Sequence, residues 1–280
     1  MSVASTKWNA VRAPLPWGLL AALLLSIAAG MLGGCAGGST PSASAPQENY
    51  TDSDEPENRK RATNRLRLAV LYFQDAKYNI ALDEVKQAIL ADPGWFEGYN
   101  MRGLIYMRTN DFAGAEASFQ KALSINPGSP DIRHNYGVLQ CKLGRHADGM
   151  RLFSQALGTP GYTRRANTLV EQGMCQLAAG QGKEADQSFA RAYEIEPANV
   201  AAGYHLALSA FQRGDLVRAQ FLTRRMNNSE AANAETLWLG VKVERRLQNR
   251  EAMGQLGTQL TKRFPQSREA SALERGAFDE

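Results

Sequence analysis

Small side chains recur along residues 61–280 with a period close to 34. One series of Ala and Gly is spaced by 34, 34, 36, 34 and 33 positions, and a second series follows it twelve positions later in each unit. The first series is Ala69, Gly103, Gly137, Gly173, Ala207 and Gly240, and the second is Ala81, Ala115, Gly149, Ala185, Ala219 and Ala252. Self-similarity at a fixed period of this length is typical of repeat proteins, in which each repeat is one supersecondary unit.

Each unit is expected to fold as two helices joined by a tight turn. The small residue of the first helix and its partner twelve positions on mark the place where the helix backbones cross, because no larger side chain fits there. A bulky residue, another alanine and a proline follow, and proline ends the unit because it cannot continue a helix. The bulky positions are Val85, Phe119, Phe153 and Phe189, the alanines are Ala88, Ala122, Ala156 and Ala192, and the prolines are Pro93, Pro127, Pro160, Pro197 and Pro265. One such hairpin cannot bury its apolar face alone, so neighbouring hairpins must stack.

This pattern resembles the tetratricopeptide repeat (TPR), a helix-turn-helix unit of 34 residues. The second unit carries its signature most fully, with Tyr99, Gly103, Tyr106, Ala115, Phe119, Ala122 and Pro127. Units five and six depart from it, because Thr223 and Leu256 replace the bulky residue. The resemblance implies an all-α fold, a right-handed superhelical solenoid of about six TPR units over residues 61–280.

In TPR proteins the first helices line a concave groove, so the resemblance also indicates which side chains meet a partner. With unit one counted from Ala62 and unit two from Phe96, the expected groove residues are Leu66, Val70, Phe73, Leu104 and Met107. Such an apolar lining favours a hydrophobic partner segment over the acidic chaperone tails that other TPR domains bind through Lys and Asn. The alternative is that some of these side chains only pack between neighbouring first helices.

The N-terminal region predicts secretion. An apolar run of 13 residues, Trp17–Ala29, follows Lys7 and Arg12; it is too short to span a bilayer, which needs about 20 residues, and is typical of a signal peptide. Leu32-Gly33-Gly34-Cys35 resembles the bacterial lipobox, in which the cysteine is acylated after cleavage. The resemblance implies removal of residues 1–34 and a covalent lipid such as palmitate on Cys35. The alternative is an ordinary signal peptide with an incidental cysteine.

Residues 35–60 are expected to form a lipidated flexible tether. They are rich in Gly, Ser, Pro and acidic residues and have almost no apolar side chains, so they cannot bury enough surface to fold. Ala36, not Asp, follows the cysteine, and by the Gram-negative sorting rule this predicts the outer membrane, facing the periplasm.

Composition excludes several function classes. Removing residues 1–34 takes Lys7 and Arg12 from the 32 basic residues and leaves 30 against 28 acidic residues, too balanced for nucleic-acid binding. His134, His146 and His205 lie in different units without metal-ligand spacing, and no catalytic motif is present. We therefore expect no enzyme activity, no metal, no cofactor other than the lipid on Cys35, and no small-molecule substrate. Cys141 and Cys175 lie on adjacent first helices and either form a disulfide or, as the favoured interpretation, remain two buried small hydrophobic residues.

Beyond the generic repeat, the chain resembles the type IV pilus biogenesis and stability lipoproteins, which are the pilotins of the pilus secretin. The resemblance covers the lipidated start and the repeat region, and the segments that carry it are Asn135–Gly137, Phe153–Leu157, Pro160–Arg164, Leu239–Lys242 and Gln259–Pro265. The longer N-terminal region and the two inner cysteines depart from the family. The resemblance implies a protein that binds secretin subunits and promotes their outer-membrane localisation and multimerisation.

Two other classes stay open at this point. A scaffold lipoprotein for outer-membrane β-barrel assembly shares the lipobox and the repeats. So does an adaptor that regulates a peptidoglycan hydrolase or polymerase.

Overall fold

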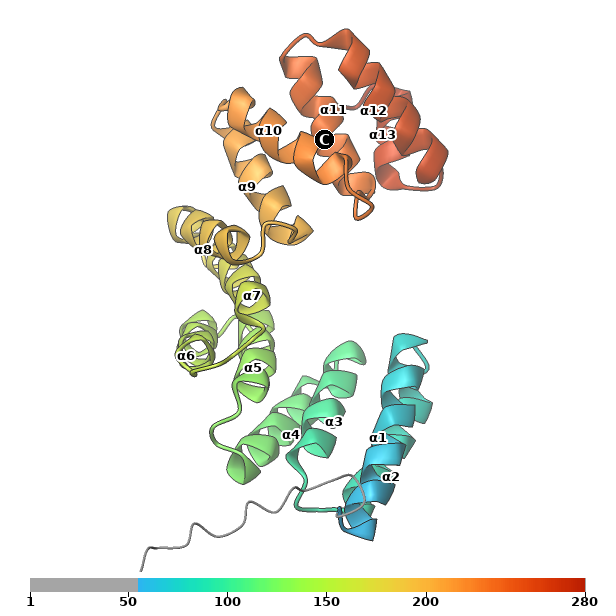
Figure 1. Ribbon diagram of the computed structural model, residues 1–280, viewed down its shortest axis with the longest axis vertical. Coiled ribbons are helices and arrows are strands. Elements are labelled where there is room, and N and C mark those ends of the chain that lie inside the picture. The colour runs from blue at the N-terminus through green and yellow to red at the C-terminus, as the bar shows by residue number, and fades with distance from the viewer. Residues whose placement is uncertain (1–54, 280) are drawn as a thin grey trace, which may run out of the picture. The chain divides into compact units, whose positions relative to one another are not determined.

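The computed structural model describes residues 55–279, which form thirteen α-helices and no strand (Figure 1). The helices are α1 (Glu57–Gln74), α2 (Tyr78–Ala91), α3 (Phe96–Arg108), α4 (Phe112–Ile125), α5 (Pro130–Lys142), α6 (His146–Leu157), α7 (Arg165–Ala178), α8 (Gly182–Ile195), α9 (Val200–Gln212), α10 (Leu216–Asn227), α11 (Ala234–Arg246), α12 (Arg250–Arg263) and α13 (Arg268–Arg275). The expected signal peptide, Cys35 and most of the tether lie outside the described residues. α1 begins at Glu57, four residues before the predicted start of the repeats. Within residues 55–279, no helix is long and apolar enough to cross a membrane.

The helices pair in chain order and the pairs stack in chain order. Each odd-numbered helix from α1 to α11 packs against the even-numbered helix that follows it, and each even-numbered helix up to α10 packs against the first helix of the next unit. First helices also touch across units, as α1 with α3 and α5 with α7 do. The predicted all-α solenoid of six helical hairpins is therefore confirmed. α13 is an addition that the repeat period did not predict, and it packs against α11 and α12.

The turn inside each hairpin has its own 34-residue series. One residue per turn adopts a positive φ, and the six are Ala76, Asn110, Gly144, Gly180, Gly214 and Gln248. Glycine at three of these positions has no Cβ to clash in the left-handed region. Polar side chains then start several of the next helices, since Asp111, Asp215 and Asn249 each accept a hydrogen bond from the backbone three residues on. Such caps satisfy backbone donors that a helix start otherwise leaves unpaired.

Glycine and phenylalanine set the distance between the helices of the three central hairpins. A Cβ atom on Gly103 would lie 2.5 Å from the ring of Phe119, one on Gly137 2.7 Å from Phe153, and one on Gly173 2.6 Å from Phe189. All three rings are fully buried. The small residue of the first helix is therefore required because the aromatic ring of the second helix occupies the space where its side chain would lie.

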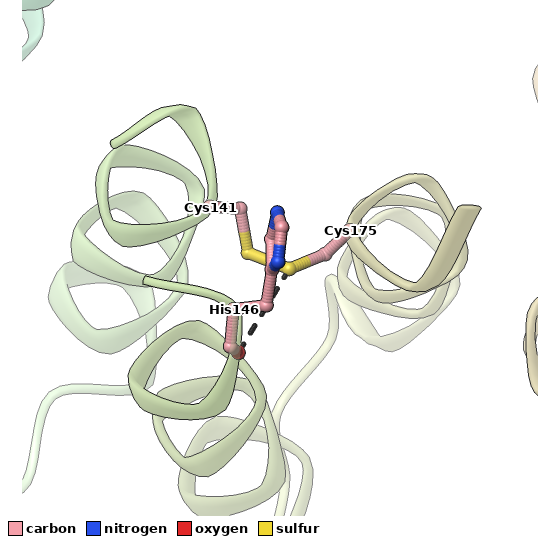
Figure 2. Close-up of a disulfide and its surroundings, with 3 residues drawn as sticks. All are labelled: Cys141, His146 and Cys175. Carbon is pink, nitrogen blue, oxygen red and sulfur yellow. Dashed lines mark hydrogen bonds between the residues drawn. A yellow bond between two sulfur atoms is a disulfide. The ribbon is translucent and has the colours of Figure 1, made fainter. Parts of the chain in front are cut away.

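Cys141 and Cys175 form a disulfide that joins α5 to α7 (Figure 2). The favoured prediction of two unbonded cysteines is therefore wrong. The two Cα atoms lie 5.5 Å apart, within the range that a disulfide spans, because α5 and α7 are neighbouring first helices. Gly149 on α6 leaves room for the bridge, since a Cβ there would meet the sulfur of Cys141.

Replacing Gly103 with alanine is expected to lower the free energy of unfolding by roughly 1–3 kcal/mol, because the added Cβ forces the Phe119 ring from its position. Gly254 on α12 provides the control, since nothing lies within 4 Å of a Cβ placed there. Gly254→Ala should stabilise the helix by about 0.5–1 kcal/mol. Urea denaturation followed by circular dichroism measures both changes. Equal midpoints for the two variants would contradict this account of the packing.

Removal of the disulfide should destabilise the chain by up to about 3–4 kcal/mol, the chain-entropy value for a loop of this size, since the cysteines are 34 residues apart. A reductant is expected to lower the urea midpoint of the natural chain. The double variant Cys141→Ser/Cys175→Ser should have that lower midpoint with or without reductant. If reductant leaves the urea midpoint of the natural chain unchanged, the disulfide does not contribute to stability.

Candidate functional site on the first helices

Several of the fifth and ninth positions of successive first helices line cavities. Counted from the start of each unit, the fifth positions are Leu66, Asn100, His134, Val170, Tyr204 and Trp238, and the ninth positions are Val70, Leu104, Val138, Met174, Leu208 and Lys242. Members of both series line three separate cavities, at α1, near the middle of the first three units and at α13. We call the side of the first helices that carries these positions the groove-facing side.

The central cavity brings three of the five predicted groove residues together. Phe73, Leu104 and Met107 line it with Val138, and its volume is about 360 Å³. These residues come from α1, α3 and α5, so the cavity exists only because three units stack. Its apolar surface suits a hydrophobic side chain of a bound segment.

The other two predicted residues lie in a different place. Leu66 and Val70 line a hollow of about 380 Å³ on α1, together with Leu71 and Trp95. Val70 is 37% exposed and Leu71 is 58% exposed, so this first helix offers apolar side chains to solvent. The predicted single groove is thus divided between the apolar α1 hollow and the central cavity, whose lining mixes apolar and polar side chains.

Two polar residues beside the central cavity, Asn135 and Glu171, were not among the predicted site residues. Asn135 lines it, and its side-chain amide donates a hydrogen bond of 3.0 Å to the Asn100 side chain. Arg108, Lys142 and Glu171 also line it. Burial raises the pKa of Glu171, and the charge of Lys142 partly offsets this. Asparagine both donates and accepts hydrogen bonds, so the cavity can hold the backbone of an extended peptide. The recurrence of Asn at similar places in units two and three was the signal that could have indicated this.

His134 lies in the same lining but serves the fold. Its Nδ1 lies 2.8 Å from the hydroxyl of Thr168, which in turn lies 2.8 Å from the hydroxyl of Tyr162. Desolvation, together with the charge of Arg164, lowers the pKa of His134 to about 4, and the charge of Asp131 opposes the shift. The imidazole is therefore neutral at pH 7. It links α5 directly to Thr168 on α7, and Tyr162 of the segment that joins units three and four contacts the same hydroxyl.

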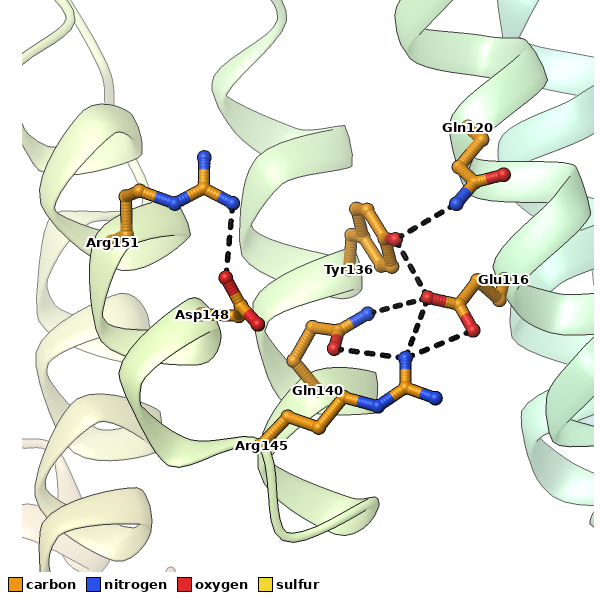
Figure 3. A network of polar contacts seen from close by, with 7 residues as sticks. All are labelled: Glu116, Gln120, Tyr136, Gln140, Arg145, Asp148 and Arg151. Atoms are coloured by element: carbon orange, nitrogen blue, oxygen red, sulfur yellow. Dashed lines mark hydrogen bonds and ion pairs between the residues drawn. The ribbon is translucent and has the colours of Figure 1, made fainter.

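A second polar cluster, around Glu116, also has a structural role (Figure 3). The Glu116 carboxylate accepts hydrogen bonds from Tyr136, Gln140 and Arg145, which ties α4 to α5 and the turn after it. Burial opposes ionisation, yet these hydrogen bonds lower the pKa of Glu116 overall. Its oxygens are committed to these partners, so the cluster offers no base or acid for chemistry. Within residues 55–279, no group of His, Cys, Asp and Glu is placed to hold a metal ion.

Comparison with known proteins agrees with the repeat geometry. Two tetratricopeptide repeat family models match, at residues 96–129 and 118–150. Over residues 96–150 the chain thus matches the tetratricopeptide repeat, and the helical hairpins on either side continue the same architecture. An uncharacterized protein of Haemophilus influenzae is 22% identical over 118 residues, which cover 42% of this chain and 66% of that protein.

Two pilus proteins are similar over most of their length. The type IV pilus assembly protein PilF of Pseudomonas aeruginosa is 19% identical over 204 residues, which cover 73% of this chain and 81% of PilF. A solved structure of that PilF shares the fold with a TM-score of 0.68 at 17% identity, over 79% of this chain and 100% of the other. The structure of PilW, a widely conserved type IV pilus biogenesis factor, aligns with a TM-score of 0.66 at 29% identity, over 76% of this chain and 97% of PilW. The TPR chain is thus similar to pilus biogenesis proteins from end to end of their solved structures.

The neutral, buried His134 predicts a pH dependence of stability. Its pKa is about 4 in the folded chain and about 6.5 when unfolded, so between these values the unfolded state binds more protons. The free energy of unfolding should therefore fall as the pH drops from about 6.5 towards 4, by up to about 3 kcal/mol.

Urea midpoints across this pH range test the expectation. His134→Gln should give a flatter profile than the natural chain, and the control His146→Gln should keep the natural slope. An unchanged slope in His134→Gln would assign the pH dependence to other groups.

Proposed function

We propose that this TPR chain is an outer-membrane lipoprotein that binds secretin subunits and promotes their localisation and multimerisation during type IV pilus biogenesis. The observation that carries the proposal is the central cavity, where Phe73, Leu104 and Met107 meet beside the amide of Asn135. The similarity to PilF and PilW supports the pilus pathway. Secretin as the partner follows from the family resemblance of the sequence.

The apolar side chains of the α1 hollow and of the central cavity suit one hydrophobic segment of a partner. Full burial of a Leu- or Phe-sized side chain contributes about 1.5–3 kcal/mol, so a few anchors in the central cavity and the α1 hollow suffice for specific binding. Leu71, which is 58% exposed, is the side chain of the α1 hollow with most area to gain. The Asn135 amide would hold the backbone of the segment between its anchors.

The lipid on Cys35 would anchor the protein in the outer membrane. Two or more acyl chains give stable membrane anchoring, whereas one gives marginal binding. A secretin subunit held by the groove-facing side would then travel with the lipoprotein to the outer membrane. Residues 36–56 would allow the repeats to reach the subunit from the anchored cysteine.

The state of the pilus secretin in a deletion strain tests the proposal. Heat-resistant secretin multimers on a denaturing gel should be lost without this protein, and with Cys35→Ala they should be depleted or found outside the outer-membrane fraction. Normal multimers in the deletion strain would contradict the proposal. Loss of many outer-membrane proteins together would instead favour a barrel-assembly role.

Groove variants test the site itself. Phe73→Ala/Leu104→Ala should reduce secretin multimers strongly, because both side chains line the central cavity. Leu90→Ala is the matched control, since Leu90 is an exposed apolar residue on α2, a second helix. Equal multimer levels in the groove variant and the control, at equal protein amounts, would rule out this cavity as the binding site.

A further inference from the structure

The outer face of α10 carries two exposed apolar side chains one helical turn apart, which no other second helix between residues 55 and 279 has. Val217 is 77% exposed, the largest value among the bulky apolar side chains of this part of the chain, and Phe221 is 61% exposed. Phe221 is also the only exposed Phe, Tyr or Trp among the described residues. Because the two residues are four positions apart, they lie on the same side of the helix.

The opposite side of α10 is packed in the core. Its buried residues are Ala219, Leu222, Thr223, Met226 and Asn227. The helix packs against α9 and α11, so Val217 and Phe221 cannot turn inward while unit five stays folded. Neither side chain lines any of the cavities described above. The pair therefore projects from the surface as a ridge.

α10 is the only helix between residues 55 and 279 that contains Lys or Arg but no Asp or Glu. Its cations surround Phe221 on the helix surface, since Arg218 precedes the ring by three positions and Arg224 and Arg225 follow it by three and four. Residues at these spacings are neighbours on a helix. The nearest acidic residue in the sequence, Asp215, lies before the helix and caps its first turn. The apolar ridge thus has a basic border.

Two of the three arginines keep their positive charge unbalanced by α10 or its packing partners. Arg224 is paired with the buried Glu244 of α11, which balances its charge. Arg225 lies 5.6 Å from the centre of the Tyr193 ring, and an aromatic ring has no net charge. Arg218 and Arg225 are both exposed. The face of α10 therefore combines apolar side chains with two cations in contact with solvent.

We propose that this α10 ridge, defined as Val217, Arg218, Phe221 and Arg225, docks on the anionic phospholipid surface of the membrane that holds the lipid on Cys35. The proposal rests on the proposed function for that anchor. Val217 and Phe221 would enter the boundary between headgroups and acyl chains, and the two arginines would contact phosphate groups. Apolar side chains bordered by cations are typical of such interfacial sites.

The size and shape of the ridge favour a lipid surface over a protein partner. Its apolar part consists of two side chains, whereas a stable protein interface involves roughly 20–30 residues on each side. A projecting ridge also needs no matching hollow, because a fluid headgroup layer can close around it. The lipid anchor would keep the ridge at a high local concentration relative to the membrane, so a weak contact suffices.

The ridge shares no residue with the central cavity or the α1 hollow. It belongs to a second helix, whereas the predicted groove residues belong to first helices. Docking would therefore hold the repeats at the membrane surface without covering the side chains proposed to bind the secretin subunit.

Fluorescence quenching by brominated acyl chains tests the contact, on the mature lipidated chain in vesicles of phosphatidylglycerol and phosphatidylcholine. Phe221→Trp places the probe on the ridge, and the signal of the parent chain, which keeps Trp95 and Trp238 after removal of residues 1–34, is subtracted. Leu90→Trp is the matched control, because Leu90 is a 72% exposed apolar residue on α2, in the unit that follows the tether.

The probe at position 221 should be quenched strongly and the probe at position 90 weakly. Replacement of phosphatidylglycerol by phosphatidylcholine, or added salt, should reduce quenching at position 221, because charge attracts the ridge to the surface. Equal quenching at the two positions would overturn the proposal, since it would show only that the anchor keeps the whole chain near the membrane. Quenching that does not depend on phosphatidylglycerol would overturn the role of the arginines.

Charge variants in the Phe221→Trp chain locate the contact. Arg218→Gln/Arg225→Gln should lower the ratio of docked to undocked chain roughly tenfold. Lys86→Gln/Lys121→Gln removes two exposed cations from α2 and α4 and should leave the ratio within about twofold. An equal loss in the two double variants would contradict a specific ridge.

Light scattering of the chain in a non-ionic detergent tests the competing occupant, a second copy of the chain. The natural chain and Phe221→Ser should have the same mass. A dimer that becomes a monomer with Phe221→Ser would assign the ridge to a contact between copies and overturn the proposal.

The outcome is separable from that of the proposed function, because secretin multimers are scored in the deletion strain. Lost multimers together with an unquenched probe at position 221 would keep the secretin role and reject the ridge. Normal multimers together with selective quenching would do the opposite. A mature chain without acyl groups, as seen by mass spectrometry, would remove the anchor and reject both.

Discussion

The structure depends on one steric constraint, the contact between a glycine backbone on one helix and a phenylalanine ring on the next. In the three central hairpins the ring occupies the position that any side chain on the glycine would take. This contact sets how closely the two helices approach, and the approach determines which residues of the first helix turn towards its neighbours. The ring is absent from unit one, where Val85 takes its place, and from units five and six, which have Thr223 and Leu256 there.

The repeat period predicted the fold well because it reports a constraint that recurs identically in each unit. The positions of Gly103, Gly137 and Gly173 followed from the need for small residues at helix crossings, and the rings of Phe119, Phe153 and Phe189 lie where the pattern placed them. The repeat period could not predict structural features that occur in only one place along the chain. The disulfide was missed because Cys141 and Cys175 are 34 residues apart where the local period is 36, so the two thiols are out of register by sequence and meet only through the actual offset of α5 and α7. α13 was missed because it follows the final proline and has no counterpart to repeat.

The sequence predicted the candidate site only in part, because the repeat pattern contains no information on contacts between units. Counting positions along the first helices identified apolar side chains on the correct helices, but it treated them as one surface. The structure separates Leu66 and Val70 from Phe73, Leu104 and Met107, because the first pair lines a hollow with Leu71 and Trp95 while Phe73 of α1 meets the other two on α3. The amide of Asn135 and the charges around it depend on contacts between units, which no single-unit pattern contains. His134 shows the converse: it occupies a groove position by count, yet its hydrogen bond to Thr168 makes it part of the joint between units three and four.

The cross-link between α5 and α7 has a mechanical consequence. A solenoid under tension normally unravels hairpin by hairpin, because each unit is held only by its neighbours. Here a pull transmitted along the backbone passes from Cys141 directly to Cys175 through a covalent bond, so α6 and the segment up to Cys175 carry no load. The residues between Cys141 and Cys175 can then be extended only after the disulfide bond itself breaks. The two flanking halves can each yield independently while the centre keeps its length.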